Sequence, residues 1–322
     1  LFAILFLVSL TTTYLFQTFT PVSVSFISFL LCISYYHIHC FMAILIVDWR
    51  KKNRHARGEI MISFIFFVIC FLASVAGAIC GIGGGVIIKP ALDTFHLMDV
   101  SAISFLSGCT VLSMSTYSVI KSKSGGHSHL DPKISFPLAI GSSLGGLLGK
   151  WMFTWLLLLS SDDSQAGAVQ TFFLLVITIG TLFYTLYKEK IPTRRITGKA
   201  ACLSIGTFLG ILSSFLGIGG GPVNLVVLFF FFSMDTKAAA ENSLYIILFS
   251  QITSLLSTLA GGSIPEFKFP VLLFMTLGGI GGGICGRWIN KYISEKTVEK
   301  LFLLLMVLII GMNVYNLFVF TR

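Results

Sequence analysis

Two glycine-rich segments carry the residues of this sequence that are best suited to bind a ligand. Residues 81–85 and 217–221 both read Gly-Ile-Gly-Gly-Gly, and each lies inside a long apolar run. Glycine costs about 1 kcal/mol per residue relative to alanine inside a helix, so four glycines in five positions predict a local break. A helix that restarts after such a break presents free N–H groups and the positive end of its dipole, which attract an anion. The two segments therefore predict a pair of anion-binding backbone sites.

Glycine has a second use in membrane helices, which is to let two helices pack closely. Packing of this kind needs a small residue at every fourth position, and three glycines in a row do not follow that spacing. We therefore favour the ligand-binding interpretation for residues 81–85 and 217–221. The packing interpretation is favoured for two other series that do have the spacing: Gly145 and Gly149, and Gly278, Gly282 and Gly286.

Polar residues that follow the glycines could complete an anion site. Lys89 lies about one turn into the first restarted helix, where its ammonium would either hold the anion or reach the nearby membrane interface. The second copy has Leu225 in its place and offers the amide of Asn224 instead. Ser107 and Ser243 occupy equivalent positions in the helices that come next. Their hydroxyls can donate to an oxyanion or join neighbouring helices, so both interpretations stay open.

One carboxylate is a candidate for coupling transport to protons. Glu241 lies near the start of an apolar run, and an ionisable group inside a membrane can load and release a proton. The alternative is an interfacial charge beside Asp235 and Lys237. The sequence alone leaves both roles open.

The composition places these segments in a membrane. Of 322 residues, 55% are apolar and only 11% are charged, whereas a soluble domain carries about 25% charged residues. The first apolar run lacks a basic segment and a cleavage site, so it is not predicted to be a signal peptide. Because the chain begins with Leu, we expect its native start to lie upstream. We predict an all-α polytopic membrane protein with about ten transmembrane helices, at residues 1–19, 24–47, 60–92, 99–120, 134–159, 167–187, 200–232, 237–260, 269–289 and 299–320.

The composition also limits the classes of ligand. The formal charge is +9, but Lys and Arg cluster in short loops between apolar runs, as the positive-inside rule requires, so no nucleic-acid binding is expected. Seven cysteines include no Cys-x-x-Cys pair, and His37 and His39 fit no common zinc pattern. No metal site and no cofactor are therefore predicted. The six histidines form no nucleophile–base constellation, so no catalytic residue is predicted.

The chain repeats itself at a shift of 136 to 137 residues. The shift superimposes the two glycine segments, two Met-Asp pairs, Ser107 on Ser243, and a Gly-Gly-x-x-Gly motif followed by Lys150 or Arg287. If every segment crosses the membrane once, the basic loop 287–300 lies on the outer side of the membrane, against the positive-inside rule. The relative orientation of the repeats therefore stays open. We predict three parts: a transmembrane hairpin with a basic loop (1–59), a first four-helix repeat (60–190) and a second four-helix repeat (191–322).

With these paired motifs, the sequence resembles the sulfite exporter TauE/SafE family. That family has two related four-helix halves, each with a Gly-x-Gly-Gly-Gly motif, an apolar turn and often a proline. The resemblance covers about residues 60–320 and implies transport of small sulfur-containing anions, such as sulfite, thiosulfate or organosulfonates. Pro222 follows its glycines directly and Pro90 comes five residues later, so the half-sites cannot be identical. The residues that match the family motif are Gly81, Gly83, Gly84, Gly85 and Pro90, and Gly217, Gly219, Gly220, Gly221 and Pro222.

The expected function is secondary transport, in which an anion binds near the membrane midplane and one half rocks against the other. The alternatives are an anion channel and an intramembrane enzyme. We expect a multi-pass protein of the plasma (inner) membrane, with the lipid bilayer and a small sulfur-containing anion as partners. The oligomeric state is not defined by the sequence. The expected substrate-binding residues are Gly81, Gly83, Gly84, Gly85, Lys89, Pro90, Ser107, Gly217, Gly219, Gly220, Gly221, Pro222, Asn224 and Ser243.

Overall fold

The structure is a computed structural model, and it describes residues 56–95, 97–124, 132–160 and 163–321. Residues from Ile60 onward form a unit of their own, and the account below concerns that unit. The predicted N-terminal hairpin, with spans at 1–19 and 24–47, lies outside the described residues, as do His37 and His39.

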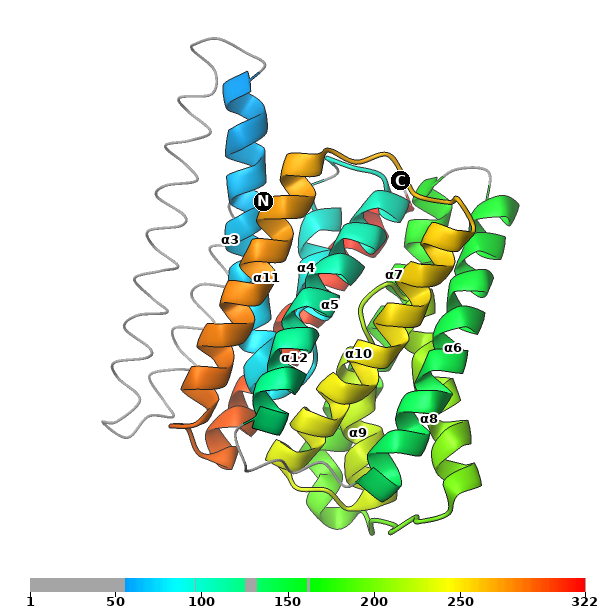
Figure 1. Cartoon of the computed structure of the whole chain (residues 1–322), viewed down its shortest axis with the longest axis vertical. Helices are drawn as coiled ribbons and strands as arrows, with labels where there is room; N and C mark the ends of the chain where they lie inside the picture. The colour runs from blue at the N-terminus through cyan, green and yellow to red at the C-terminus, as the bar shows by residue number, and fades with distance from the viewer. Residues whose placement is uncertain (1–55, 96, 125–131, 161–162, 322) are drawn as a thin grey trace. The chain divides into compact units, whose positions relative to one another are not determined.

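Every regular element in the described ranges is helical (Figure 1). Helices suit the apolar runs because they satisfy all backbone hydrogen bonds within one segment, as a lipid environment requires. Seven of the helices in this part of the chain are long and apolar enough to cross a membrane. The helices are α3 (Ala56–Cys80), α4 (Gly85–Asp93), α5 (Val100–Ser124), α6 (Pro132–Leu159), α7 (Asp163–Tyr187), η2 (Lys188–Lys190), α8 (Lys199–Phe215), α9 (Gly221–Phe232), α10 (Thr236–Ala260), α11 (Phe269–Asn290) and α12 (Glu295–Phe320).

The element order runs twice through one pattern. A first helix ends at a glycine break, a short helix follows, and three long helices complete the set: α3 to α7, and then α8 to α12. The eight spans expected between residues 60 and 320 all correspond to helices of this series. Two of them, 60–92 and 200–232, are divided by their glycine segments, as the glycine content predicts.

The chain folds back at each break. A Cβ placed on Gly84 would lie 3.1 Å from the Cα of Ser74, so the residues after the break lie beside the end of α3. Leu92, near the end of α4, shares a buried apolar cluster with Phe66 of α3. Helix α4 therefore returns along α3 and does not extend it. The run 60–92, expected to be a single crossing, is a long helix followed by a short returning helix.

Equivalent helices of the two repeats run in opposite directions. By the colours of Figure 1, α3 and α5 run from top to bottom, while α8 and α10 run from bottom to top. The repeats are therefore inverted, an arrangement found in many secondary transporters. Because each break returns the chain, the linker 188–199 and the turn between α11 and α12 both lie at the lower end. Both are basic, so these two loops lie on one side, and the positive-inside rule applied to them predicts that the lower end faces the cytoplasm. The start of α3, with Arg57, lies at the upper end.

Helices are exchanged between the two repeats. Helix α6 packs along α8 and α10, and α11 packs along α5. Along α6 and α11, a Cβ on any of six glycines would overlap a backbone carbonyl of the helix opposite, which confirms the packing interpretation of the spaced glycines. The contacts join Gly141, Gly145 and Gly149 to Leu203, Thr207 and Ile211 of α8, and Gly278, Gly282 and Gly286 to Phe67, Phe71 and Val75 of α3.

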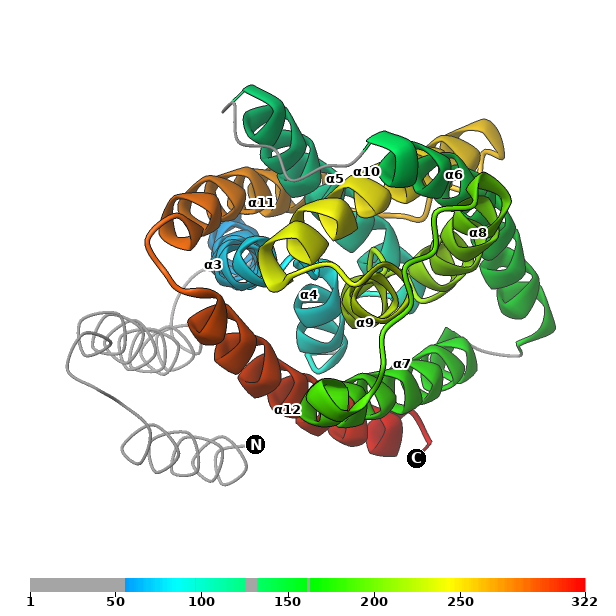
Figure 2. The same cartoon turned by 90° about the horizontal axis from the view of Figure 1, so that it is seen from below.

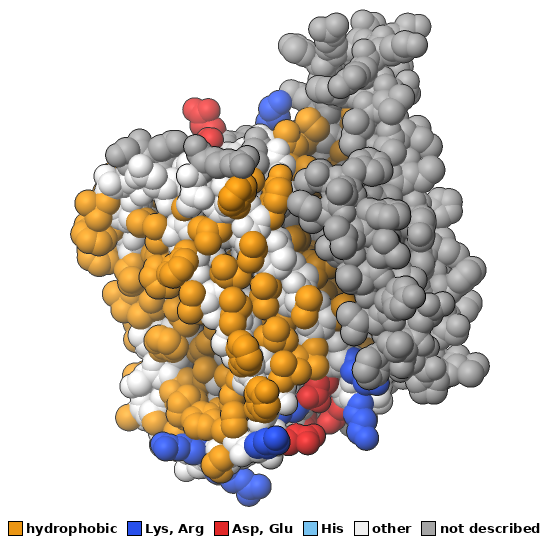
Figure 3. Space-filling view, turned by 180° about the vertical axis from the view of Figure 1, so that it is seen from behind, with side chains coloured by type: hydrophobic (Ala, Val, Ile, Leu, Met, Phe, Trp, Pro, Cys, Tyr) orange, Lys and Arg blue, Asp and Glu red, His pale blue; other side chains and the backbone are white. Residues whose placement is uncertain are grey.

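The outer surface is apolar along the helices. Figure 3 shows hydrophobic side chains covering this face of the described part, with Lys and Arg gathered mainly at its lower end. Trp151, Trp155, Trp288 and Tyr292 are all more than half exposed, and aromatic side chains of this kind mark the membrane–water interface. The surface therefore suits a multi-pass protein surrounded by lipid.

Candidate anion-binding site

The two glycine breaks meet in the middle of the bundle. Seen from below, α4 and α9 lie side by side at its centre (Figure 2). A Cβ on Gly85 would overlap the carbonyl oxygen of Ile218, and a Cβ on Gly221 would lie 3.6 Å from the carbonyl oxygen of Ile82. Ile82 and Ile218 are equivalent at the 136-residue shift, so the contact is reciprocal. The break segments predicted to form a pair are therefore neighbours in space.

Glycine is required at the start of each break. Gly81 has φ of +74° and Gly217 has φ of +66°, a left-handed conformation that costs other residues roughly 1–2 kcal/mol. Each also lies against the helix that follows the other break. A Cβ on Gly81 would overlap Ala240 of α10, and a Cβ on Gly217 would lie 2.9 Å from the Cβ of Ser104 on α5. Ala240 and Ser104 are again equivalent at the shift, so backbone shape and close approach both exclude a side chain.

The two half-sites differ in detail. Gly84 is in the right-handed helical region with φ of −59°, whereas its counterpart Gly220 has φ of +91°. Pro222 occupies the first turn of α9, where its missing N–H removes a donor that would have no helical partner. Pro90 lies inside α4. The restarted helices therefore offer different sets of free N–H groups, in agreement with the difference that the two proline positions predict.

An apolar contact closes the space between the breaks. Val111 of α5 and Ile247 of α10 are fully buried and equivalent at the 136-residue shift. A Cβ on Gly83 would lie 3.1 Å from the Cδ1 of Ile247, and a Cβ on Gly219 would lie 2.8 Å from the Cγ1 of Val111. The centre of the molecule is thus filled by two aliphatic side chains, which would block an anion in this conformation.

Three of the polar residues predicted near the breaks are buried with unsatisfied groups. Ser107, Ser243 and Asn224 are fully buried. The two hydroxyl oxygens and both polar atoms of the amide have no hydrogen-bond partner within the described part of the chain. A Cβ on Gly220 would lie 2.7 Å from Nδ2 of Asn224, which places this amide at the second break. Buried polar groups are nearly always paired, so a polar ligand would supply partners for these groups, of which Asn224 is the one in contact with a break.

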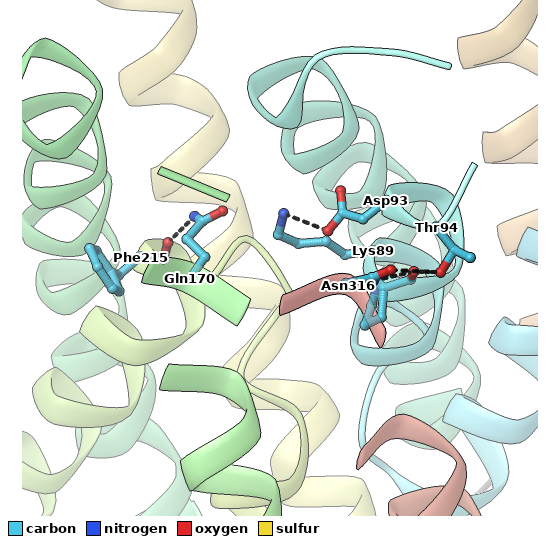
Figure 4. Close-up of polar contacts among 7 residues, drawn as sticks. Lys89, Asp93, Thr94, Gln170, Phe215 and Asn316 are labelled. Carbon is cyan, nitrogen blue, oxygen red and sulfur yellow. Dashed lines mark hydrogen bonds and ion pairs between the residues drawn. The ribbon is translucent and has the colours of Figure 1, made fainter. Parts of the chain in front are cut away.

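Lys89 is engaged in an ion pair inside the protein. Its ammonium lies 3.2 Å from a carboxylate oxygen of Asp93, and both side chains are almost wholly buried (Figure 4). Asn316 of α12 donates to the carbonyl of Pro90 at 2.8 Å and so fixes the end of α4. The Lys89 side chain is therefore shielded from the surface of the protein, and its charge is compensated within α4. The spacing of four residues between Lys89 and Asp93 was a sequence signal for this pair.

Glu241 interacts electrostatically with a basic residue of the exchanged helix α11. The half-buried Glu241 on α10 interacts electrostatically with Arg287 on α11. The guanidinium of Arg287 also donates to the carbonyl of Ser118 at 2.7 Å. This interaction was not expected from the sequence, which suggested Asp235 and Lys237 as the neighbours of Glu241.

A pocket beside the second break brings together residues that the sequence did not single out. Lys150 of α6 borders it, and the described residues provide no carboxylate within ion-pair distance of its ammonium. The amide of Gln251 and the hydroxyl groups of Ser104, Ser214 and Ser254 also line the pocket. Lys150 appeared in the sequence only as the end of a packing motif. A cation at the same place in both repeats, Lys150 and Arg287, was the signal that could have identified it.

Comparison with known proteins agrees with this architecture. The family model described as sulfite exporter TauE/SafE matches residues 65–313. A "probable membrane transporter protein YunE" of Bacillus subtilis (strain 168) is 23% identical over 283 residues, which cover 77% of this chain and 96% of that protein. No solved structure matches the chain. Since the family model covers both glycine breaks and the helices that surround them, the chain belongs to the sulfite exporter TauE/SafE family of membrane transporters.

Proposed function

We propose that this protein is a secondary transporter of the plasma membrane that carries a small sulfur-containing anion, such as sulfite, thiosulfate or an organosulfonate. One observation carries the proposal: two glycine-broken helices from oppositely oriented repeats meet at the centre of the bundle. Broken helices at a repeat interface form the substrate sites of many secondary transporters. Their free N–H groups and dipoles suit an anion, and the family to which the chain belongs suggests that the anion contains sulfur.

The binding step follows from the groups around the breaks. An anion that enters would accept hydrogen bonds from the N–H groups at the starts of α4 and α9. The side-chain groups of Ser107, Ser243 and Asn224, which have no partners among the described residues, would add donors. Val111 and Ile247 would have to separate before the anion could pass to the other side. This requirement favours alternating access over a continuously open pore.

The helix exchange determines which parts would move. Helices α3, α5 and α11 pack together, and helices α6, α8 and α10 form a second group, so each group contains helices from both repeats. The two groups meet along α5 and α10, where Val111 and Ile247 lie. We therefore expect these two groups to rock against each other, in place of the two sequence halves first expected.

Flux into proteoliposomes tests the proposal. The purified protein is reconstituted, and uptake of radiolabelled sulfite, thiosulfate and a short organosulfonate is measured against concentration, with and without a pH gradient. We expect saturable uptake of at least one of these anions. Non-saturable flux would favour the anion channel, and uptake of a cation or neutral solute alone would overturn the proposal.

The same assay examines coupling to protons. If Glu241 carries the proton, Glu241→Gln should retain saturable uptake but lose its stimulation by the pH gradient. Asp235, which accepts a hydrogen bond from the Ala238 N–H at the start of α10, supplies the control variant Asp235→Asn. An unchanged response of Glu241→Gln to the gradient would show that this carboxylate does not carry the proton.

A further inference from the structure

The pocket beside the second glycine break has an uncompensated positive charge. Lys150 is half-buried, and its ammonium lies over the ring of Phe153, 5.2 Å from the centroid. The described residues place no carboxylate within ion-pair distance of this ammonium. A charge at this depth is expensive unless a counter-ion is present, and a small anion would supply one.

Polar side chains line the same pocket as Lys150. The hydroxyl oxygens of Ser104 and Ser214 are shielded from solvent and have no hydrogen-bond partner within the described ranges, and both residues line the pocket. Ser214 is only 4% exposed. The side-chain amide of Gln251, which is 3% exposed, lies on the same wall. Its donor reaches the Ser213 hydroxyl only at 3.5 Å. A cation, an amide and two hydroxyls are the donor set that an oxyanion prefers.

The counterpart of this pocket in the other repeat has different residues. The 137-residue shift puts Arg287 in the position of Lys150, and the 136-residue shift puts Glu241 in the position of Phe105. There the cation is already engaged, because Arg287 donates to the carbonyl of Ser118 and interacts with Glu241. The described residues place neither cation within ion-pair distance of a carboxylate. Arg287 nevertheless has a carbonyl partner and the attraction of Glu241, whereas the pocket of Lys150 is lined by Phe105 where the other repeat has Glu241.

We propose that Lys150, Gln251, Ser104 and Ser214 form an entry site that binds the oxyanion group of the substrate before it reaches the glycine breaks. The site deepens the proposed function and rests on it. Its place supports this role, because Gly217 of the second break lines the same pocket. The corresponding place at Arg287 in the other repeat binds the anion less well, because Glu241 repels it. The two ends of the transport pathway therefore differ in their affinity for the anion.

The exchange of Phe105 for its repeat counterpart provides the sharpest test. Phe105→Glu puts into the pocket of Lys150 the carboxylate that the other repeat has at this position, while Phe105→Gln removes the same ring without adding a charge. We expect Phe105→Glu and Lys150→Met to raise the KM for sulfite at least tenfold, since each removes a charge-assisted contact. Phe105→Gln and Lys150→Arg should stay within about threefold of the wild type. Lys121→Met, at an exposed lysine outside the pocket, is the control for loss of a positive charge.

A binding measurement makes the test independent of transport. Thermal melting of each purified variant is recorded with and without sulfite, because a ligand that binds the folded state raises its melting temperature. The wild type, Phe105→Gln and Lys150→Arg should show a rise, whereas Phe105→Glu and Lys150→Met should not. A rise in the wild type without any flux would overturn only the proposed function. The entry site is overturned if sulfite does not shift the wild type, or if Lys150→Met and Phe105→Glu keep the wild-type KM.

Discussion

The ammonium of Lys89 lies 3.2 Å from a carboxylate oxygen of Asp93, one turn further along α4, and each side chain is only 2% exposed. The second repeat has Leu225 and Phe229 at the two equivalent positions. One repeat therefore has a buried ion pair where the other has two apolar side chains. Both versions pack inside the same fold, so the natural sequence already contains a neutral replacement for the pair.

Removing one partner of this pair should destabilise the protein much more than removing both. Lys89→Leu removes the cation that is paired with the buried Asp93 carboxylate, and breaking a buried ion pair from one side typically costs about 3–5 kcal/mol. The double variant Lys89→Leu/Asp93→Phe copies the second repeat and should recover most of that loss. Thermal melting in detergent measures both variants, with Asp93→Phe as the second single variant. Equal melting temperatures for the single and double variants would contradict a coupled pair.

The same double variant tests whether Lys89 binds substrate. We expect it to retain saturable anion uptake, because the ammonium is compensated within α4 and does not border the pocket. Flux is compared at equal amounts of folded protein. Restored stability together with a loss of uptake would show that the charge of Lys89 contacts the anion, as the sequence first suggested.

Alanine at the start of either break should disrupt transport. Gly81→Ala and Gly217→Ala force a side chain into a left-handed conformation, at a cost of roughly 1–2 kcal/mol. They also push the new Cβ into Ala240 or towards Ser104. We expect reduced folded yield and loss of uptake for both variants. Gly180→Ala and Gly311→Ala are matched controls, since a Cβ at either position meets nothing within 4 Å. Wild-type uptake by Gly81→Ala and Gly217→Ala would show that the breaks do not form the site.

Smaller side chains at the centre should make the protein leaky. Val111→Ala and Ile247→Ala remove the aliphatic groups that fill the space between the breaks. We expect the double variant to add a non-saturable component to anion flux, measured as uptake that rises linearly at high concentration. Leu209→Ala, at another fully buried site, controls for the loss of core packing, which costs about 2–5 kcal/mol. An unchanged flux curve would place the barrier elsewhere.

Much of the fold could be predicted from the sequence because it depends on local composition. The glycine content of residues 81–85 and 217–221 predicts the breaks, and the 136-residue shift correctly pairs Ser104 with Ala240 and Val111 with Ile247. The return of α4 along α3 could not be predicted in this way. An apolar run such as 60–92 does not encode the direction in which its second part runs, and that direction depends on contacts with distant residues.

The candidate site was less accessible to sequence reasoning than the fold. Lys89 was the prominent charge because it follows the glycines, but its role depends on Asp93, its partner one turn further along α4. Lys150 lies 69 residues from the first break and 67 residues before the second. It borders Gly217 only because α6 is exchanged onto α8 and α10. A helix exchange of this kind leaves no periodic signal, so the residues that it brings together are found only in the folded chain.

Larger side chains should separate the exchanged helices where glycines of α6 and α11 contact the backbone of α8 and α3. Gly145→Val on α6 and Gly282→Val on α11 place a branched side chain against the carbonyl oxygens of Thr207 and Phe71. Backbone atoms cannot move aside as a flexible side chain can, so we expect each variant to lower the melting temperature. Overpacking of a tight contact typically costs about 1–3 kcal/mol. The two helix contacts are equivalent in the repeats, so both variants should lower the melting temperature to a similar degree. Gly180→Val tests whether valine itself is tolerated on a membrane helix of this protein. If Gly145→Val melted at the same temperature as Gly180→Val, α6 would not pack against α8 as closely as the carbonyl contacts require. Helix α6 would then not belong to the moving group that contains α8 and α10.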